Sequence, residues 1–392
     1  SSAASDVYKR QVILLCLFTS CSKFSKVIHS NLSSLEEIVI DPQKGQRLPF
    51  DSLIEKIEYV KLESLNDNLI GKISQILFSD SLLFIIDSES TKTINIFDLK
   101  GNFKYRICHV GNGPKEYVDI SNVCIVPNKK QLAILDRIQR RILYYKYNGE
   151  YVLTEQIPFI NDYFEYLESG NKAYEIYGMN DPELGGDKEN SLVVTNSVND
   201  VIYSFFKDIY KKDFYYTKNR TLRKFQEEVY YSPNIADTIY CIKDSLVEAK
   251  YYINITQDNV TDMEIVNTEQ FHKMLEDHYF FNGDFIELKN FTYINIMSPW
   301  GYPSAVYVHG KKKTYLSSGI GNHPFFAFMG TAPKARYKEN CIVIDVQSYQ
   351  ILAQKSQLYN GERYKQLLDS LFENLTEDSN PVLFFYYLNE RL

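Results

Sequence analysis

The stretch ISQILFSDSLLFIIDSESTKTINIFDLKGNFKYRI, residues 73–107, decides the fold, because its pattern returns in residues 120–153, ISNVCIVPNKKQLAILDRIQRRILYYKYNGEYVL. Asp87 of the first copy aligns with Asp136 of the second, and Gly101 aligns with Gly149. Four short β-rich runs joined by tight turns, repeating at about 48 residues, are typical of one blade of a β-propeller. The runs are too short, and too rich in Ile, Phe, Tyr and Val, for a helical repeat. We therefore predict an all-β propeller.

The rest of the chain continues this pattern in weaker form, and its length suits six blades. Ile54–Leu62 alternates apolar and charged residues, as a half-buried strand does. The apolar run Pro381–Leu388 lies near the C-terminus, and pairing the two segments in one blade would close the ring and remove exposed edges. Blade three is assigned to Glu165–Tyr177 with Ser191–Phe206, and blade four to Val229–Ile255. Blade five is assigned to Thr292–Met297, Ala305–His309 and Thr314–Leu316. Blade six is assigned to Phe325–Met329, Cys341–Asp345 and the C-terminal run, joined by the segment Ile57–Leu62.

Two stretches interrupt the strands with helical spacing. Thr268–Tyr279 and Gly361–Leu375 both place apolar residues at i, i+3 and i+4. We predict two short helical insertions that cover a blade, in preference to helices that bind a partner.

Composition narrows the classes of function. Apolar residues make up 44% and charged residues 24% of the chain, as expected for a globular protein with a large core. The formal net charge is −7 and no long basic run occurs, which argues against binding to nucleic acid. The 32 Tyr and 24 Phe residues suit half-buried strands, and we expect them to fill the spaces between blades rather than to form one ligand platform.

None of the six cysteines forms a C-x-x-C pair, and Cys108, Cys124, Cys241 and Cys341 are expected to be buried free thiols.

The N-terminal segment resembles a bacterial lipoprotein signal. Lys9-Arg10 precedes a short apolar run, which is too short to span a bilayer and leads directly into Thr19-Ser20-Cys21. We predict a signal peptide at residues 1–20, lipidation of Cys21, a lipidated tether at 21–46 and the propeller at 47–392. An ordinary cleaved signal peptide or a buried N-terminal strand is the alternative. The absence of acidic residues directly after Cys21 favours a membrane anchor that faces the periplasm over one exposed at the cell surface.

The chain as a whole resembles the six-bladed β-propeller lipoproteins of the Bacteroidota, which have NHL-like blades. The resemblance covers roughly residues 50–390 and rests on Ile96-Phe97-Asp98-x-x-Gly101, Gly111–Tyr117, Asp237–Tyr240 and Asn380–Leu383. Lys115 stands where the family's G-x-G-P-G-E-Y motif has its third glycine. The resemblance implies an envelope-associated propeller, often found near polysaccharide-uptake systems, in a family for which no general catalytic activity is established.

The motifs of common enzymes are missing from the sequence. Gly111–Pro114 leads into a strand, whereas a nucleotide-binding loop leads into a helix, so it is interpreted as a turn between blades. No G-x-S-x-G elbow of an α/β-hydrolase occurs. The six histidines include no H-x-H or H-E-x-x-H pair, so no cofactor is predicted, and a metal site would need ligands from different blades.

Loops of a propeller gather at its two faces, where ligands bind. The candidate ligand-binding residues are polar or aromatic residues of such loops: His109, Asp136, Arg137, Arg140, Trp300, Tyr302 and His323. Trp300 and Tyr302 could stack on a sugar ring or fill a gap between blades, and a hydrogen-bonded role in a turn is the simpler interpretation of either histidine.

The first hypothesis for the function is a lipid-anchored, non-catalytic module that binds a glycan, a peptide or an envelope protein. The alternative is a propeller lyase or hydrolase with a divalent metal ion in the central channel.

Overall fold

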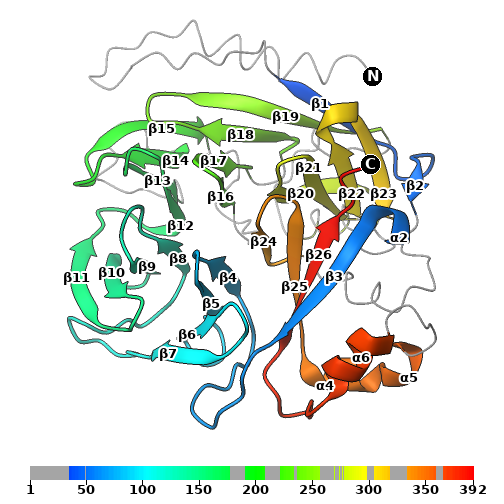
Figure 1. Ribbon diagram of the computed structural model, residues 1–392. Coiled ribbons are helices and arrows are strands. Elements are labelled where there is room, and N and C mark those ends of the chain that lie inside the picture. The colour runs from blue at the N-terminus through cyan, green and yellow to red at the C-terminus, as the bar shows by residue number, and fades with distance from the viewer. Residues whose placement is uncertain are drawn as a thin grey trace, which may run out of the picture. The chain divides into compact units, whose positions relative to one another are not determined.

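The computed structural model describes residues 35–48, 50–176, 190–207, 221–233, 236–256, 269, 273, 276, 278–297, 304–317, 333–358 and 365–392. Their strands form six sheets, which confirms the prediction of a six-bladed β-propeller (Figure 1). Blade one is β4 (Gln75–Phe78), β5 (Leu82–Asp87), β6 (Thr93–Asp98) and β7 (Phe103–Ile107); blade two is β8 (Asn122–Ile125), β9 (Gln131–Asp136), β10 (Arg141–Lys146) and β11 (Tyr151–Gln156); blade three is β12 (Asn161–Tyr166), β13 (Lys172–Ile176), β14 (Asn190–Thr195) and β15 (Val201–Lys207). Blade four is β16 (Leu222–Phe225), β17 (Glu228–Tyr231), β18 (Thr238–Ile242) and β19 (Val247–Ile255); blade five is β20 (Phe280–Glu287), β21 (Phe291–Met297), β22 (Ser304–Val308) and β23 (Lys313–Ser317); blade six is β24 (Ala335–Tyr337), β25 (Cys341–Val346), β26 (Val382–Leu388) and β3 (Ile54–Lys61).

The repeat in blades one and two is built on matched turns. Gly101 and Gly149 occupy equivalent hairpin turns, and both have positive φ, +91° and +85°. This left-handed conformation is accessible to glycine without a Cβ clash. In the first turn the Asp98 carboxylate accepts the backbone N–H groups of Lys100 and Asn102 at 2.9 and 3.0 Å. The turn chemistry therefore sets where β6 and β10 end.

The two chain ends close blade six as predicted. β26 pairs antiparallel with β3, with Val382 opposite Lys61 and Phe384 opposite Tyr59. Asn380, just before β26, is buried, and its side chain accepts the Ile70 N–H at 2.9 Å and donates to the Glu63 carbonyl at 2.9 Å. These bonds tie the C-terminal strand to the segment that leads into blade one.

The N-terminal segment contributes strands that the sequence did not suggest. β1 (Glu36–Ile40) pairs parallel with β19, and Ile38 and Ile40 are fully buried. β2 (Arg47–Leu48) pairs parallel with β23. The tether predicted for residues 21–46 is therefore wrong for residues 36–40, because the apolar face of this short segment is covered when it adds a fifth strand to blade four.

Several blade boundaries also differ from the predictions. β16 and β20, the first strands of blades four and five, were not predicted. In blade six the first strand is β24; the run Phe325–Met329 that was assigned to it lies outside the described residues. These first strands carry polar residues such as Arg223, Asp284 and Arg336, and this breaks the alternation by which strands are recognised.

One predicted helical insertion lies between β25 and β26. Its helix is α6 (Lys365–Phe372), and two helices that were not predicted precede it, α4 (Ser348–Ala353) and α5 (Lys355–Leu358); the three are grouped at one end of blade six (Figure 1). Of the predicted helix at Thr268–Tyr279, the structure describes Glu269, Lys273 and Glu276, which are helical, and His278 and Tyr279, which are not. The remaining described helices are α2 (Phe50–Leu53) and the 3₁₀ turn η3 (His309–Lys311). None of the helices in the described part of the chain has the length and apolar character needed to cross a membrane.

The chain divides into two compact units, one of residues 44–156, 285–295 and 302–392, the other of residues 1–43, 157–284 and 296–301. In the first unit, apolar side chains fill the spaces between blades one and two, around Phe84 and Leu143, and between blades six and one, around Phe97 and Leu383. A third cluster packs Leu368 and Leu371 of α6 against blades five and six. The core of the second unit lies between blades three and four. The prediction that aromatic residues fill these spaces agrees with the burial of Tyr117, Tyr145, Phe84 and Phe97.

Candidate functional site

Asp87 and Asp136, the aligned aspartates of the repeat, each hold the loop that enters their blade. Asp87 accepts the backbone N–H groups of Gly71 and Lys72 at 2.9 and 3.2 Å. Asp136 accepts the Val118 N–H at 2.9 Å and the Gln139 N–H at 3.2 Å. Both carboxylates are fully buried, and buried charges persist where donors satisfy them. The repeat thus encodes a carboxylate that fixes each inter-blade loop.

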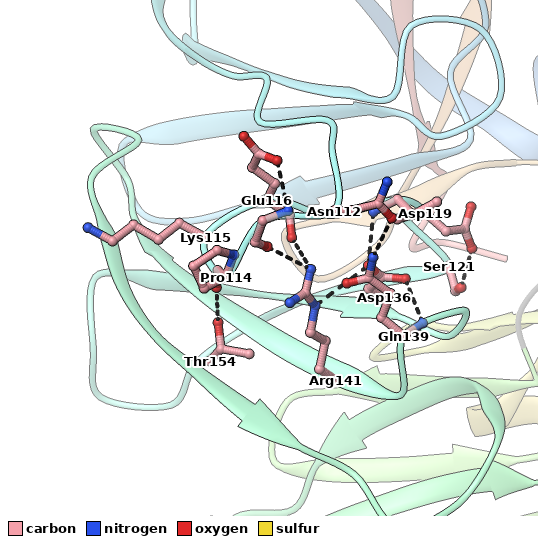
Figure 2. Close-up of polar contacts among 12 residues, drawn as sticks. Asn112, Pro114, Lys115, Glu116, Asp119, Ser121, Asp136, Gln139, Arg141 and Thr154 are labelled. Carbon is pink, nitrogen blue, oxygen red and sulfur yellow. Dashed lines mark hydrogen bonds and ion pairs between the residues drawn. The ribbon is translucent and has the colours of Figure 1, made fainter.

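The loop Gly111–Tyr117, which leads from blade one into blade two, has further supports (Figure 2). The Arg141 guanidinium donates to the carbonyls of Gly113, at 3.1 Å, and Glu116, and its Nε lies 3.8 Å from the Asp136 carboxylate. Thr154 donates to the Pro114 carbonyl at 3.0 Å. Because Arg141 comes from β10 and Thr154 from β11, two strands of blade two brace this loop.

Two tyrosine hydroxyls add to these supports, one from β10 and one from the end of the loop itself. The Tyr145 hydroxyl donates to the Lys115 carbonyl at 2.5 Å, and the Tyr117 hydroxyl donates to the Lys92 carbonyl at 2.8 Å. Burial raises the pKa of both phenols above the ordinary value, so they stay protonated donors at neutral pH. The imidazole of His109 stacks on the Tyr145 ring, with centroids 5.3 Å apart and planes 5° apart.

The loop and the neighbouring β9–β10 turn join into one surface. The Gln139 side chain donates to the Asn112 side-chain oxygen at 3.0 Å, which links the two segments (Figure 2). The two segments expose Asn112, Pro114, Lys115, Glu116, Ile138 and Arg140, and His109 and Val110, just before the loop, are exposed as well. We call His109, Val110, Asn112, Ile138 and Arg140 the loop patch. Val110 is 49% and Ile138 61% exposed, which is a large exposure for apolar side chains. The loop patch therefore presents apolar and polar groups on a braced backbone.

The structure brings together part of the predicted site. His109, Arg137 and Arg140 lie in the two linked segments; His109 and Arg140 are exposed and Arg137 is half-buried. Asp136 lies in the same place but is fully buried beneath them. Trp300, Tyr302, His323 and the predicted lipidation site Cys21 lie outside the described residues. The ligand-binding role of these residues stays a prediction.

The described cysteines and acidic residues do not form a metal centre. Among the residues that the structure describes, no three His, Cys, Asp or Glu side chains are grouped so as to hold a metal ion. Cys108, Cys124, Cys241 and Cys341 are free thiols, as predicted. Cys108 is exposed, however, and the prediction that it is buried is wrong, because it follows the end of the edge strand β7.

Comparison with known proteins places the chain in a family. Residues 35–387 match a domain of unknown function, DUF4934. The chain belongs to the DUF4934 family. A search of the curated proteins finds no match. The start of the DUF4934 match at residue 35 agrees with the position of β1, which the structure places in blade four.

Two solved structures resemble this DUF4934 domain in fold. One is a predicted exported protein from Bacteroides fragilis, 18% identical, with a TM-score of 0.73 over 91% of this chain and 99% of that one. The other is a member of the DUF4221 family from Bacteroides vulgatus, 10% identical, with a TM-score of 0.53 over 86% of this chain and 97% of that one. At these identities the likeness concerns the fold.

The residues that hold the loop patch were not predicted from the sequence. Arg141 and Tyr145 lie in an apolar strand, where polar and aromatic residues are expected to alternate with aliphatic ones. Only the β9–β10 turn, however, separates Arg141 from the aligned Asp136. That proximity of a buried acid and a cation was the available signal. Tyr117 and Tyr145 belong to a chain with so many tyrosines that none stands out.

Proposed function

We propose that this protein is a non-catalytic binding module of the bacterial envelope whose loop patch binds a peptide segment of another protein. The observation that carries the proposal is the braced loop patch, which exposes Val110 and Ile138 together with His109, Asn112 and Arg140. Exposed apolar groups with a polar rim are the usual composition of a protein-binding surface. A backbone held by Arg141 loses little conformational entropy when a ligand binds.

A peptide fits the described residues better than the other partners considered for this fold. The aromatic residues expected to stack on a glycan, Trp300 and Tyr302, lie outside the described residues, whereas the loop patch offers apolar side chains and hydrogen-bonding groups. The metal-dependent lyase or hydrolase has no support from the described residues, because they include no grouped metal ligands.

The loop patch can be tested in intact cells with a photo-crosslinking amino acid. Placed at Ile138, it should give a discrete protein adduct, because this side chain is 61% exposed within the loop patch. Placed at Val198, a matched position that is 71% exposed in blade three, it should give none. Adding Val110→Glu to the Ile138 probe should reduce the adduct by roughly tenfold or more, since a charge then enters an apolar contact. Equal adducts at positions 138 and 198, or an adduct that carries carbohydrate and no protein, would overturn the proposal.

We also propose that the module is attached to the membrane through lipid on Cys21, facing the periplasm. The signal-like segment before Cys21 supports the anchor, and the fold shared with a predicted exported protein of Bacteroides fragilis is consistent with an envelope or secreted location. Cys21→Ala should move the protein from the membrane fraction to the soluble fraction, because alanine lacks the sulfur atom to which the lipid would be attached. Cys108→Ala is the matched control and should stay in the membrane fraction. If Cys21→Ala remains membrane-bound, the lipid anchor is wrong.

A further inference from the structure

A pocket of about 330 Å³ lies between the closing blade and the first blade, remote from the loop patch. Its lining includes Glu58 of β3, Phe78 and Leu83 of blade one, and Tyr337 and Phe385 of blade six. Leu83 lies near the start of β5, whereas Asp87, which holds an inter-blade loop, ends that strand. The pocket is thus at the opposite end of the strands from the inter-blade loops. Its size falls in the range of small-molecule sites.

The apolar wall of the pocket consists of three aromatic rings from three strands. Phe78 lies 4.9 Å from Tyr337 and 6.0 Å from Phe385, and Tyr337 lies 5.1 Å from Phe385, centroid to centroid. Phe385 is 5% exposed, while Phe78 and Tyr337 are half-buried and so present ring surface to the pocket. Aromatic faces carry partial negative charge and attract C–H groups that carry partial positive charge.

The polar wall is a carboxylate with spare acceptor capacity. Glu58 accepts a hydrogen bond from the Tyr387 hydroxyl at 2.7 Å and pairs with Lys56. Burial acts to raise the pKa of Glu58, but the hydrogen bonds from Lys56 and Tyr387 outweigh it and lower that pKa below the ordinary value. The group is therefore a carboxylate at neutral pH. A carboxylate has about four lone-pair directions, so a ligand can still donate to it.

Charge around the pocket restricts what can enter. Glu58 is the charged residue among the lining side chains, and it disfavours an anionic group inside. Lys56 lies over the Tyr387 ring at 5.3 Å, and Lys338 lies over the Tyr337 ring at 5.1 Å. These two ammonium groups are not among the lining residues, and they repel a cationic ligand from the carboxylate and from the aromatic wall.

We propose that this pocket binds a neutral, sugar-sized ring that packs a C–H face on Phe78 and Tyr337 and donates a hydroxyl or amide hydrogen to Glu58. A pyranose has both features, an apolar face and hydroxyl donors at its rim. The site is separate from the loop patch, so it goes beyond the proposed function, and either can fail without the other.

The test compares three probes that share one ring and differ in charge: N-acetylglucosamine, glucosamine and glucuronate. Saturation-transfer NMR and calorimetry on the full chain should show N-acetylglucosamine binding roughly tenfold more tightly than either charged probe. Glu58→Gln should weaken N-acetylglucosamine and remove the discrimination against glucuronate, because the repelling charge is gone. Glu150→Gln is the matched control, since Glu150 pairs with Lys146 at 3.0 Å outside the pocket, and it should change neither affinity.

A second variant tests the aromatic wall. Phe78→Ala should lower the affinity for N-acetylglucosamine by roughly tenfold or more, whereas Tyr105→Ala, which removes a 46% exposed ring outside the pocket, should leave it unchanged. Binding of glucosamine or glucuronate at least as tight as that of N-acetylglucosamine would overturn the proposal. So would the absence of binding by all three probes, or affinities that neither Glu58→Gln nor Phe78→Ala changes.

Discussion

Gly101→Ala is expected to lower the free energy of unfolding by roughly 2–5 kcal/mol, the sum of a left-handed backbone cost and a steric one. Gly101 has φ of +91°, and an added Cβ would lie 2.1 Å from the Lys61 carbonyl oxygen and 2.9 Å from Val60 Cγ1. Both contacts belong to β3, the strand that closes the ring. The Gly101 carbonyl also accepts the Glu63 N–H at 2.9 Å, so displacing the turn costs a further bond.

The measurement is urea unfolding of Gly101→Ala beside Gly170→Ala. Gly170 has nearly the same φ, +87°, but nothing lies within 4 Å of its added Cβ, so this control should lose only about 1–2 kcal/mol. The difference between the two variants isolates the contact between the Gly101 turn and β3. If the two lose the same free energy, that close contact does not exist in solution.

The features that sequence predicted well are those repeated at short range. Asp87 with Asp136 and Gly101 with Gly149 recur at matched positions, and each pair performs the same task in its blade. Alternation in Ile54–Leu62 identified a strand before its partner was known, and closure of the ring then required the C-terminal run. Local turn chemistry and the period-2 pattern were sufficient for this part of the fold.

The features that sequence missed depend on contacts between distant residues. β1 covers the edge of β19, more than two hundred positions along the chain, and nothing in the run Glu36–Ile40 indicates that partner. β16 and β24 are three or four residues long, which is too short for a clear pattern. Helices α4 and α5 are also short, and their stability comes from packing in the cluster that includes Ile351 and Leu358 rather than from propensity.

The candidate sites also divide into residues that the sequence predicted and residues that it did not. His109 and Arg140 were predicted because they lie in loops, and loops carry exposed polar groups in any propeller. The pocket was not predicted, since Glu58, Phe78, Tyr337 and Phe385 come from four strands and look like ordinary strand residues in sequence. Convergence of such residues can be inferred only when the pairing of β3 with β26 is known.

Closure of blade six by the two chain ends is the claim on which the fold and the pocket rest. β3 carries Glu58 of the pocket, and the segment after it leads into the first inter-blade loop, whose Gly71 N–H is held by Asp87. In the observed register Lys61 lies opposite Val382, and Lys61 contacts α6 through the Ser370 carbonyl at 3.0 Å. Facing residues of an antiparallel pair have Cα atoms about 4.5–5.5 Å apart, which a disulfide can span.

The most direct test of closure is disulfide formation in a Lys61→Cys, Val382→Cys chain that also carries Cys108→Ser to remove the exposed native thiol. Mass spectrometry after oxidation should find a peptide that links positions 61 and 382. The disulfide should raise the free energy of unfolding by about 5 kcal/mol, because it closes almost the whole chain into one loop. Lys61→Cys with Leu383→Cys is the control; a shift of one residue places the second thiol on the opposite face of the sheet, so it should not cross-link. Failure of the 61–382 link, or equal yield for 61–383, would contradict the closed propeller described here.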